Sequence, residues 1–293
     1  MRTLRTVAAI RDHVATARRT GRTIGLVPTM GAFHAGHGAL MRAARERCDE
    51  VVVWLFVNPT QFDEQSDLAA YPRDEAKDAA EAAALGVDVL FAPTVEEVYP
   101  QGFATTVRVE GLGDVLEGAA RGPGHFVGVC TVVTKMLNMV APDLAFFGQK
   151  DAQQVAVLRR MVTDLDIPVQ LVVIPTVREP DGLALSSRNV RLDPDERRRA
   201  VALARALRAA ETLVEDGERD PEQIAARARA AMADVEPEYL ALVDPDSFQP
   251  ITNVNGRVLM AVAARVGDTR LIDNTIITTA ATPAGAPTTQ EDT

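Results

Sequence analysis

The first 177 residues alternate between short apolar runs rich in β-branched residues and longer segments in which apolar residues recur at helical spacing. The runs predict buried strands, and they read TIGLVPT, VVVWLFVNP, VDVLFAP, LAFFG and VQLVVIPTV. The segments between them predict helices, and they read HGALMRAARERC, RDEAKDAAEAAALG, VGVCTVVTKMLNMV and AQQVAVLRRMVTDL. The first helix places one face at the i, i+3, i+4, i+7 positions His37, Leu40, Met41, Ala44 and Cys48. This alternation predicts an α/β fold whose parallel sheet is covered on both faces and binds ligands beyond the carboxyl ends of its strands.

The pattern changes after Asn189. A long helix is predicted over 193–217, with Asp193 as N-cap and Pro194 at its first position, and a second helix is predicted to begin at 220–221. EYLALVD, GRVLMAVAARVG and TRLIDNTIIT then predict a small antiparallel sheet. We therefore predict a domain over 1–177, a smaller α+β domain over 178–279, and a tail over 280–293 that lacks apolar anchors and is expected to be disordered.

Composition narrows the class of protein. A net charge of −10 disfavours a broad nucleic-acid or acidic-membrane surface, and the arginines of the carboxy-terminal helices interleave with Glu and Asp, as on a solvated face. Cys48 and Cys130 are too few for a disulfide framework, and each is expected to be a buried free thiol. Neither an amino-terminal signal-type segment nor a run of about 18 apolar residues occurs, so we expect a cytoplasmic protein with no membrane partner.

The stretch PTMGAFHAGHGAL carries two histidines at the junction of a strand and a helix. Free backbone N–H groups and the helix dipole make such a junction an anion site, above all for phosphates. Gly31 and Gly36 let the backbone approach a ligand, and His34 and His37 can donate to phosphoryl oxygens from one side. The alternatives are a pair of structural histidines or a zinc site, although no third Cys or His lies nearby in the sequence. Neither a GxGxxG nor a GxxxxGK[ST] loop occurs.

Two further clusters follow predicted strands. In FFGQKDAQQ, Gly148 precedes Lys150 and Asp151, a cation that suits phosphate and a carboxylate that suits Mg²⁺. The alternative is a surface ion pair. DGLALSSRN offers two hydroxyls and a guanidinium that could clamp a polyphosphate, or it is an ordinary polar turn; the residues are Ser186, Ser187 and Arg188.

FVNPTQF places two neutral amides, Asn58 and Gln61, at the carboxyl end of the second strand. Such groups fit a substrate whose hydroxyls and carboxylate need oriented hydrogen bonds. The alternative for Asn58 is turn capping. Clusters of this kind at several strand ends together indicate one binding site.

At this point the sequence resembles a known family. PTMGAFHAGH, FVNPTQF, YPRD, GPGHFVGVCTVVTK, FFGQKDAQQ and DGLALSSRN occur in an order and spacing similar to the pantothenate synthetase (pantoate–β-alanine ligase) family, and the match runs from about Leu4 to Thr278. The His-x-Gly-His motif alone marks only the wider nucleotidylyltransferase and class I aminoacyl-tRNA synthetase superfamily. FVNPTQF together with FGQKDAQQ narrows the resemblance to the one family.

The resemblance implies a Rossmann-like amino-terminal domain, a smaller carboxy-terminal lid and a homodimer. It also implies an ATP-dependent reaction in two steps. The carboxylate of pantoate attacks the α-phosphate of ATP to give pantoyl adenylate and pyrophosphate, and the amine of β-alanine then displaces AMP. Rival interpretations are another nucleotidylyltransferase with a phosphorylated acceptor, whose acceptor site would need basic residues, and a non-catalytic nucleotide-binding regulator, which would lack the phosphate-contacting residues.

The resemblance also implies roles for individual residues. The ATP phosphates are contacted by His34, His37, Lys150, Ser186, Ser187 and Arg188. The nucleotide pocket is lined by Pro28, Thr29, Met30, Gly31, Gly36, Gly148, Asp151, Val177 and Leu185, and Met30 also borders pantoate. Gln61 and Gln154 hold pantoate, Asn58 lies close to it, Tyr71 lies near the entrance, and Asp78 contacts Mg²⁺. Relative to the family pattern, ARGPGHF carries one extra residue, Gly122, so Arg121 is not assigned a role.

Overall fold

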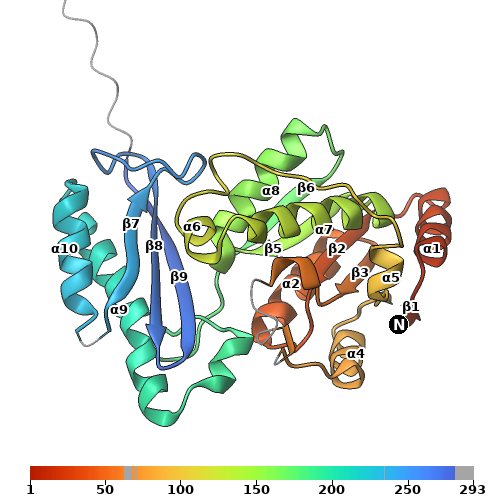
Figure 1. Cartoon of the computed structure of the whole chain (residues 1–293), viewed down its shortest axis with the longest axis horizontal. Coiled ribbons are helices and arrows are strands. Elements are labelled where there is room, and N and C mark those ends of the chain that lie inside the picture. The colour runs from red at the N-terminus through yellow and green to blue at the C-terminus, as the bar shows by residue number, and fades with distance from the viewer. Residues whose placement is uncertain (63–67, 70, 234, 281–293) are drawn as a thin grey trace, which may run out of the picture.

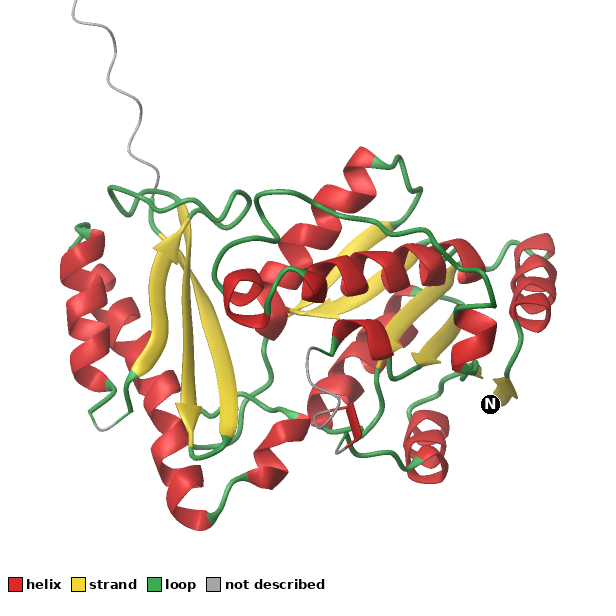
Figure 2. Ribbon diagram, in the orientation of Figure 1, coloured by secondary structure: helices red, strands yellow, loops and turns green. Residues whose placement is uncertain are grey.

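The computed structural model describes residues 1–62, 68–69, 71–233 and 235–280, and it contains two sheets side by side (Figures 1 and 2). The larger sheet is parallel, with strand order β1-β4-β3-β2-β5-β6. Its strands are β1 (Arg2–Leu4), β2 (Ile24–Thr29), β3 (Glu50–Leu55), β4 (Val89–Phe91), β5 (Leu144–Gly148) and β6 (Gln170–Ile174). The predicted α/β fold with a parallel sheet is confirmed. The strand order reverses direction at β2, with β3 on one side and β5 on the other, which is where ligands bind in folds of this kind.

Helices cover both faces of the large sheet (Figure 2). They are α1 (Val7–Arg19), α2 (Ala35–Arg47), α4 (Glu75–Ala84), α5 (Val95–Val98), α6 (Glu117–Arg121), α7 (Gly124–Val140) and α8 (Ala152–Asp164). Three short 3₁₀ turns also occur, η1 (Pro59–Gln61), η2 (Gln149–Asp151) and η3 (Ser187–Arg191). The helices predicted at 37–48, 73–86, 127–140 and 152–165 lie close to the observed bounds of α2, α4, α7 and α8. No element was predicted at β1, α1, α5 or α6.

The pleat of β3 explains how one sequence serves two apolar layers. Val52 and Trp54 point into the core formed with α1, α7 and α8, whereas Val51 and Val53 point into the core formed with α2 and α4. Side chains of successive strand residues point to opposite faces, so a continuous apolar run is what a sheet buried on both faces requires.

The smaller sheet is antiparallel, with order β7-β8-β9, and its strands are β7 (Pro237–Val243), β8 (Arg257–Val266) and β9 (Thr269–Thr278). One face of the sheet packs on α9 (Pro194–Glu215) and α10 (Pro221–Ala231). The predicted N-cap is confirmed, because the Asp193 carboxylate accepts the N–H groups of Asp195 and Glu196. On the opposite face, Leu259 and Ala261 of β8 pack with Ala156 of α8.

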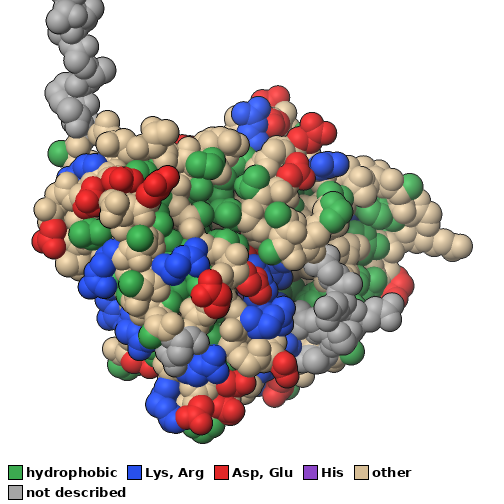
Figure 3. All heavy atoms as spheres, turned by 60° about the vertical axis from the view of Figure 1, so that its left-hand side comes forward, with side chains coloured by type: hydrophobic (Ala, Val, Ile, Leu, Met, Phe, Trp, Pro, Cys, Tyr) green, Lys and Arg blue, Asp and Glu red, His purple; other side chains and the backbone are tan. Residues whose placement is uncertain are grey.

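Several expectations have plain outcomes. Cys48 and Cys130 are buried free thiols as predicted, but Cys48 lies just beyond α2 as its C-cap rather than within the helix. None of the helices in the described residues is long and apolar enough to cross a membrane. Both signs of charge occur over the carboxy-terminal face (Figure 3). Within the carboxy-terminal part of the chain, Arg229 pairs with Glu236 and Arg197 with Asp181. The boundary between 177 and 178 stays a prediction, and residues 281–293 of the predicted tail lie outside the described residues.

Candidate active site

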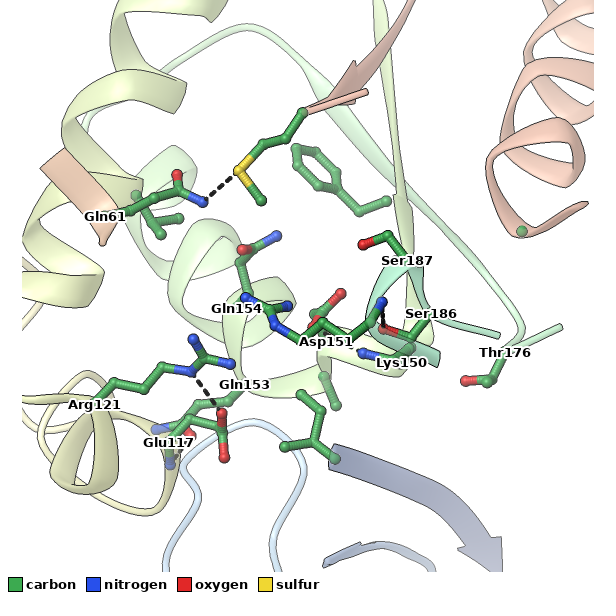
Figure 4. A pocket seen from close by; sticks show the side chains of 18 of the residues that line it. Gln61, Glu117, Arg121, Lys150, Asp151, Gln153, Gln154, Thr176, Ser186 and Ser187 are labelled. Atoms are coloured by element: carbon green, nitrogen blue, oxygen red, sulfur yellow. Dashed lines mark hydrogen bonds and ion pairs between the residues drawn. The ribbon is translucent and has the colours of Figure 1, made fainter. Parts of the chain in front are cut away.

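A cavity of about 730 Å³ opens at the carboxyl ends of β2, β5 and β6, between the large and small sheets (Figure 4). That volume lies within the usual range of small-molecule sites. The cavity is lined by most of the residues singled out from the sequence: Pro28, Thr29, Met30, His34, Gly36, His37, Asn58, Gln61, Tyr71, Gly148, Lys150, Asp151, Gln154, Val177, Leu185, Ser186, Ser187 and Arg188. Gly31 and Asp78 are not among its lining residues.

The His-x-Gly-His stretch forms the start of α2. His34 is the N-cap, and its Nδ1 accepts the N–H of Gly36 at 3.1 Å, while Nδ1 of His37 accepts the N–H of His34 at 3.4 Å. The two histidines thus take the reciprocal roles that Ser and Glu take in a capping box. A Cβ at position 36 would lie 2.8 Å from Cε1 of His34, so glycine is what allows the His34 ring to fold back over the helix end.

These hydrogen bonds fix the protonation of the two rings. Because Nδ1 accepts a hydrogen bond in both, the neutral rings carry their proton on Nε2. Burial, aided by the neighbouring His34, lowers the pKa of His37 to about 3, and burial together with the charge of Lys150 lowers the pKa of His34. The ring centroids lie 4.2 Å apart. His34 and His37 are therefore two adjacent neutral N–H donors at a helix N-terminus.

Positive charge at this end of the cavity comes from elsewhere. Lys150 lies on η2, directly after β5, and its Nζ is 3.7 Å from the carboxylate of Asp151. Ser186 caps η3 by accepting the N–H of Arg188 at 3.3 Å. Figure 4 shows Lys150, Asp151, Ser186 and Ser187 close together on one side of the cavity. The Lys–Asp pair and the polar turn, which are ordinary when taken alone, are brought into one site.

The amides after β3 have different roles. Asn58 is buried, and its amide caps η1: Oδ1 accepts from the N–H of Thr60 and from the Tyr99 hydroxyl, and Nδ2 donates to Oε1 of Gln61 at 3.0 Å. Gln61 is thereby oriented with its Nε2 directed at the sulfur of Met30, 3.1 Å away (Figure 4). The turn-capping alternative holds for Asn58, and Gln61 is the amide left to face a ligand.

Two adjacent glutamines on α8 are separated in the same way. Gln153 is buried, accepts the N–H of Glu117 at 2.9 Å and donates to the carbonyls of Leu112 and Val115 at 2.7 and 2.8 Å. Gln154 forms no side-chain hydrogen bond within the part of the chain that the structure describes, and it projects into the cavity (Figure 4). Of the two, only Gln154 has its amide available to a ligand.

Tyr71 is buried at the edge of the cavity, where its ring meets Phe62 edge-on at 5.7 Å.

The placement of Asp78 argues against the metal role expected for it. Asp78 is buried, and its two carboxylate oxygens accept the N–H groups of Ala32 and Phe33, each at 2.9 Å. A Cβ on Gly31, which has a φ of +88°, would lie 2.8 Å from that carboxylate. Asp78 and Gly31 therefore shape the turn after β2 from outside the cavity. Among the described residues, no group of three His, Cys, Asp or Glu side chains could hold a metal ion.

A buried ionic cluster that was not predicted from the sequence joins α6 to the small sheet and lines the cavity. Glu117 of α6 accepts two hydrogen bonds from Arg270 of β9, at 2.7 and 2.8 Å, one from Arg121 at 2.9 Å and one from the Tyr239 hydroxyl at 2.8 Å. Burial raises the pKa of Glu117, but the hydrogen bond from Arg270 and the charges of both arginines outweigh it and lower the pKa to about 2. Arg270 and Tyr239 lie more than 100 positions from Glu117, so no local pattern connects them, and the one member close in the sequence, Arg121, had been given no role.

Neither thiol is placed to act as a nucleophile in the cavity. Burial raises the pKa of Cys48 to about 11 and that of Cys130 to about 12, and neither lines the cavity. The cavity thus brings neutral and cationic donors together with side-chain amides. Such donors suit an anionic polyphosphate, and such amides suit the hydroxyls and carboxylate of a small acid.

Comparisons with known proteins bear on this arrangement. Residues 2–276 match the family model described as pantoate-beta-alanine ligase. The chain is 53% identical over 284 residues to the pantothenate synthetase of Moorella thermoacetica, covering 94% of this chain and 99% of that one. It is 49% identical over 292 residues to the pantothenate synthetase of Koribacter versatilis, covering 98% of this chain and 100% of that one.

Solved structures agree. The crystal structure of pantothenate synthetase from Thermus thermophilus superposes with a TM-score of 0.89 at 46% identity, covering 94% of this chain and 99% of that one. Pantoate-beta-alanine ligase from Francisella tularensis, solved in complex with β-γ ATP and β-alanine, superposes with a TM-score of 0.76 at 33% identity, covering 94% and 97%.

Proposed function

The chain belongs to the pantoate–β-alanine ligase family, and from that membership we propose how its cavity carries out the ATP-dependent condensation of pantoate with β-alanine. The products are pantothenate, AMP and pyrophosphate, by way of a pantoyl adenylate. One observation carries the assignment of roles: the donors of His34, His37 and Lys150 face the same cavity as the amides of Gln61 and Gln154.

The triphosphate of ATP lies at the start of α2 and against η2 and η3. Nε2–H of His34 and of His37 donates to phosphate oxygens, and Lys150 and Arg188 supply the positive charge. Ser186 and Ser187 add hydroxyl donors. Charge develops on the α-phosphate as the carboxylate attacks, and donors already aimed at that position lower the barrier without reorganising. The remaining nucleotide contacts fall to the residues that line the cavity around Met30, Gly148, Asp151, Val177 and Leu185.

Pantoate lies against the side-chain amides of Gln61 and Gln154. Nε2 of Gln61 and the amide of Gln154 bind its oxygens, Asn58 holds Gln61 in place, and Tyr71 borders the entrance. Both reacting groups come from the substrates, so the protein's contribution is to place the carboxylate in line with the α-phosphate and then to admit the amine. The acyl adenylate is reactive toward water, which gives a carboxy-terminal lid over 178–279 its purpose.

Magnesium is proposed to arrive with ATP as part of the substrate. Mg²⁺ in such sites keeps several waters and phosphate oxygens and needs only one or two protein carboxylates. Asp151 is the carboxylate beside Lys150 at the phosphate end, and it fits that need, whereas Asp78 already holds two backbone N–H groups. We also propose, from the family resemblance, a homodimer in the cytoplasm. Light scattering that reports about the 31.5 kDa of one chain would overturn the dimer.

Exchange of labelled pyrophosphate into ATP tests the proposal. The enzyme with ATP, Mg²⁺ and pantoate should carry out this exchange in the absence of β-alanine, because the first half-reaction needs no amine. The Cys48→Ala/Cys130→Ala double variant should keep both the exchange and the ligase activity. Exchange that strictly requires β-alanine, or a well-folded double variant without activity, would contradict the two-step, nucleophile-free reaction. Replacing pantoate by phosphorylated acceptors should give no exchange, which separates the proposal from other nucleotidylyltransferases.

A further inference from the structure

Strand β9 of the small sheet reaches across to the two segments that carry the phosphate-binding residues. In Figure 1, β9 is the strand of the small sheet that lies nearest the large sheet. Its central residues Asp273 and Asn274 are 3% and 4% exposed, although both are polar. Buried polar groups are retained where they make hydrogen bonds, so the partners of this pair show what it does.

Asn274 holds η2. Its Nδ2 donates to the backbone carbonyls of Gln149 at 3.0 Å and of Lys150 at 2.8 Å, and its Oδ1 accepts Nε2 of Gln149 at 3.1 Å. Both protons of the amide are therefore used on the backbone of a three-residue turn, more than 120 positions away in the sequence. The N-cap of this turn is Gly148, which has no side chain with which to hold the turn.

Asp273 holds the other segment. Its carboxylate takes two hydrogen bonds from Arg178, at 2.6 and 2.9 Å, and Arg178 also donates to the carbonyl of Asn274 at 3.2 Å. Arg178 pairs with Ala184 across a short bridge, just before Ser186. Residues 273 and 274 thus connect β9 to both of the segments that carry the proposed phosphate-binding residues.

We propose that Asn274 is a positioning residue for Lys150: it holds the backbone of η2 so that Nζ of Lys150 stays at the polyphosphate. This inference rests on the proposed function of Lys150. This contact also links the small sheet to the proposed reaction, because any movement of β9 would displace the Asn274 amide that holds the backbone of Lys150. A shift of about 1 Å at a catalytic group can cost 10²-fold in rate, so a backbone clamp of this kind is enough to matter.

A double-mutant cycle tests the inference, with pyrophosphate exchange as the rate and calorimetric binding of ATP and AMP as the second measurement. Asn274→Ala should lower exchange by about 10-fold or more. It should weaken ATP by about 10-fold and AMP by less than about twofold, because only the longer phosphate chain extends to Lys150. In a Lys150→Ala background, Asn274→Ala should change neither quantity by more than about twofold, since its effect passes through the missing side chain.

The matched control is Thr275→Val, one residue along the same strand. The hydroxyl of Thr275 bonds to Glu211 of α9, so this variant removes a β9 side-chain hydrogen bond without touching η2. It should leave the exchange rate and the ATP-to-AMP affinity ratio within about twofold of wild type. If it lowers them as Asn274→Ala does, Asn274 has only a structural role and the inference is overturned.

The outcomes separate the two proposals. If Lys150→Ala lowers exchange but the Asn274 effect multiplies with it, the inference is overturned and the proposed function stands. If Lys150→Ala leaves exchange and ATP binding unchanged, the role proposed for Lys150 fails and the inference fails with it. Should Asn274→Ala not fold, Asn274→Asp keeps the side-chain volume but has no N–H for the two carbonyls. A wild-type ATP-to-AMP affinity ratio in Asn274→Asp would also overturn the inference.

Discussion

Glu117→Gln should destabilise the protein strongly at neutral pH and measurably less at pH 3.5. The Glu117 side chain is 8% exposed and meets the guanidinium groups of Arg270 and Arg121. The amide of Gln cannot be ionised, so the variant loses the charge while it keeps the shape. The pKa of Glu117 falls from 4.5 to about 2 in the fold. At about 1.36 kcal/mol for each unit, that difference corresponds to about 3 kcal/mol of stability at pH 7, at the lower end of what breaking a buried ion pair costs.

The sign of the pH dependence follows from linkage. A depressed folded pKa contributes stability that is fully present above the unfolded pKa of 4.5 and is lost as the pH falls toward 2. Between about pH 7 and pH 3.5, the unfolded chain binds a proton that the folded chain does not. The contribution of residue 117 to the free energy of unfolding therefore falls by about 1.4 kcal/mol over that range in wild type and does not change in the variant. The gap between the two proteins should narrow from about 3 to about 2 kcal/mol.

Urea unfolding of wild type and variant at the two pH values measures the gap, and the other carboxylates cancel because both proteins carry them. Asp164→Asn is the control. It breaks an ion pair between Asp164, whose side chain is 44% exposed, and Arg160, whose side chain is 60% exposed, and it should cost less than about 1 kcal/mol. A gap that stays constant between the two pH values would refute the reasoning, because it would mean that Glu117 contributes by packing rather than by charge.

Other predictions address the cavity directly. His37→Ala should lower pyrophosphate exchange by about 10²-fold with the fold intact, and near wild-type turnover would reduce His37 to a helix cap. Gln154→Ala should raise the Kd of pantoate by about 10-fold, as expected for a lost hydrogen bond to a charged group, and leave that of ATP nearly unchanged; calorimetry showing equal losses would contradict its placement. Asp78→Asn should cost about 1–3 kcal/mol in thermal or urea unfolding without changing the Mg²⁺ concentration that gives half-maximal activity, whereas a raised Mg²⁺ requirement would restore its metal role.

The large sheet and most of the residues that line its cavity could be predicted from the sequence for a physical reason. A strand buried on both faces is a continuous apolar run, and a covering helix repeats its apolar face every three or four residues, so both patterns are local. Helix α1 was missed because its buried face consists only of Ile10, Val14 and Ala17, set among polar residues. Its spacing is regular, but the stripe is narrow. Strand β1, with three residues, is too short for any period to show.

The site residues show what a local sequence pattern cannot predict, namely the direction of a side chain and its partners far away in the sequence. A sequence gives the type of a side chain but not its direction, and Asp78 is an acidic residue that points at backbone N–H groups rather than into the cavity. The adjacent Gln153 and Gln154 are identical in type, and only their positions around α8 decide that the amide of Gln153 holds α6 while the amide of Gln154 is available in the cavity. The residues contributed by β9 could not be found, because their partners lie 95 to 153 positions away and no local period connects them.

In the proposed mechanism, the protonation of the two histidines decides which groups supply positive charge to the transition state. A pair of imidazolium ions at the start of α2 would repel each other and would each need to stay ionised while buried, and the lowered pKa of each ring favours the neutral form instead. In the proposed mechanism, His34 and His37 are then oriented neutral donors, and Lys150 and Arg188 supply the positive charge. Since the pKa of His37 is about 3, its ring in the ligand-free enzyme should show no proton uptake by NMR between about pH 8 and pH 5. A titration near pH 6.5 would mean that the Nδ1 hydrogen bond from His34 does not persist in solution, and the orientation of both donors would lose its basis.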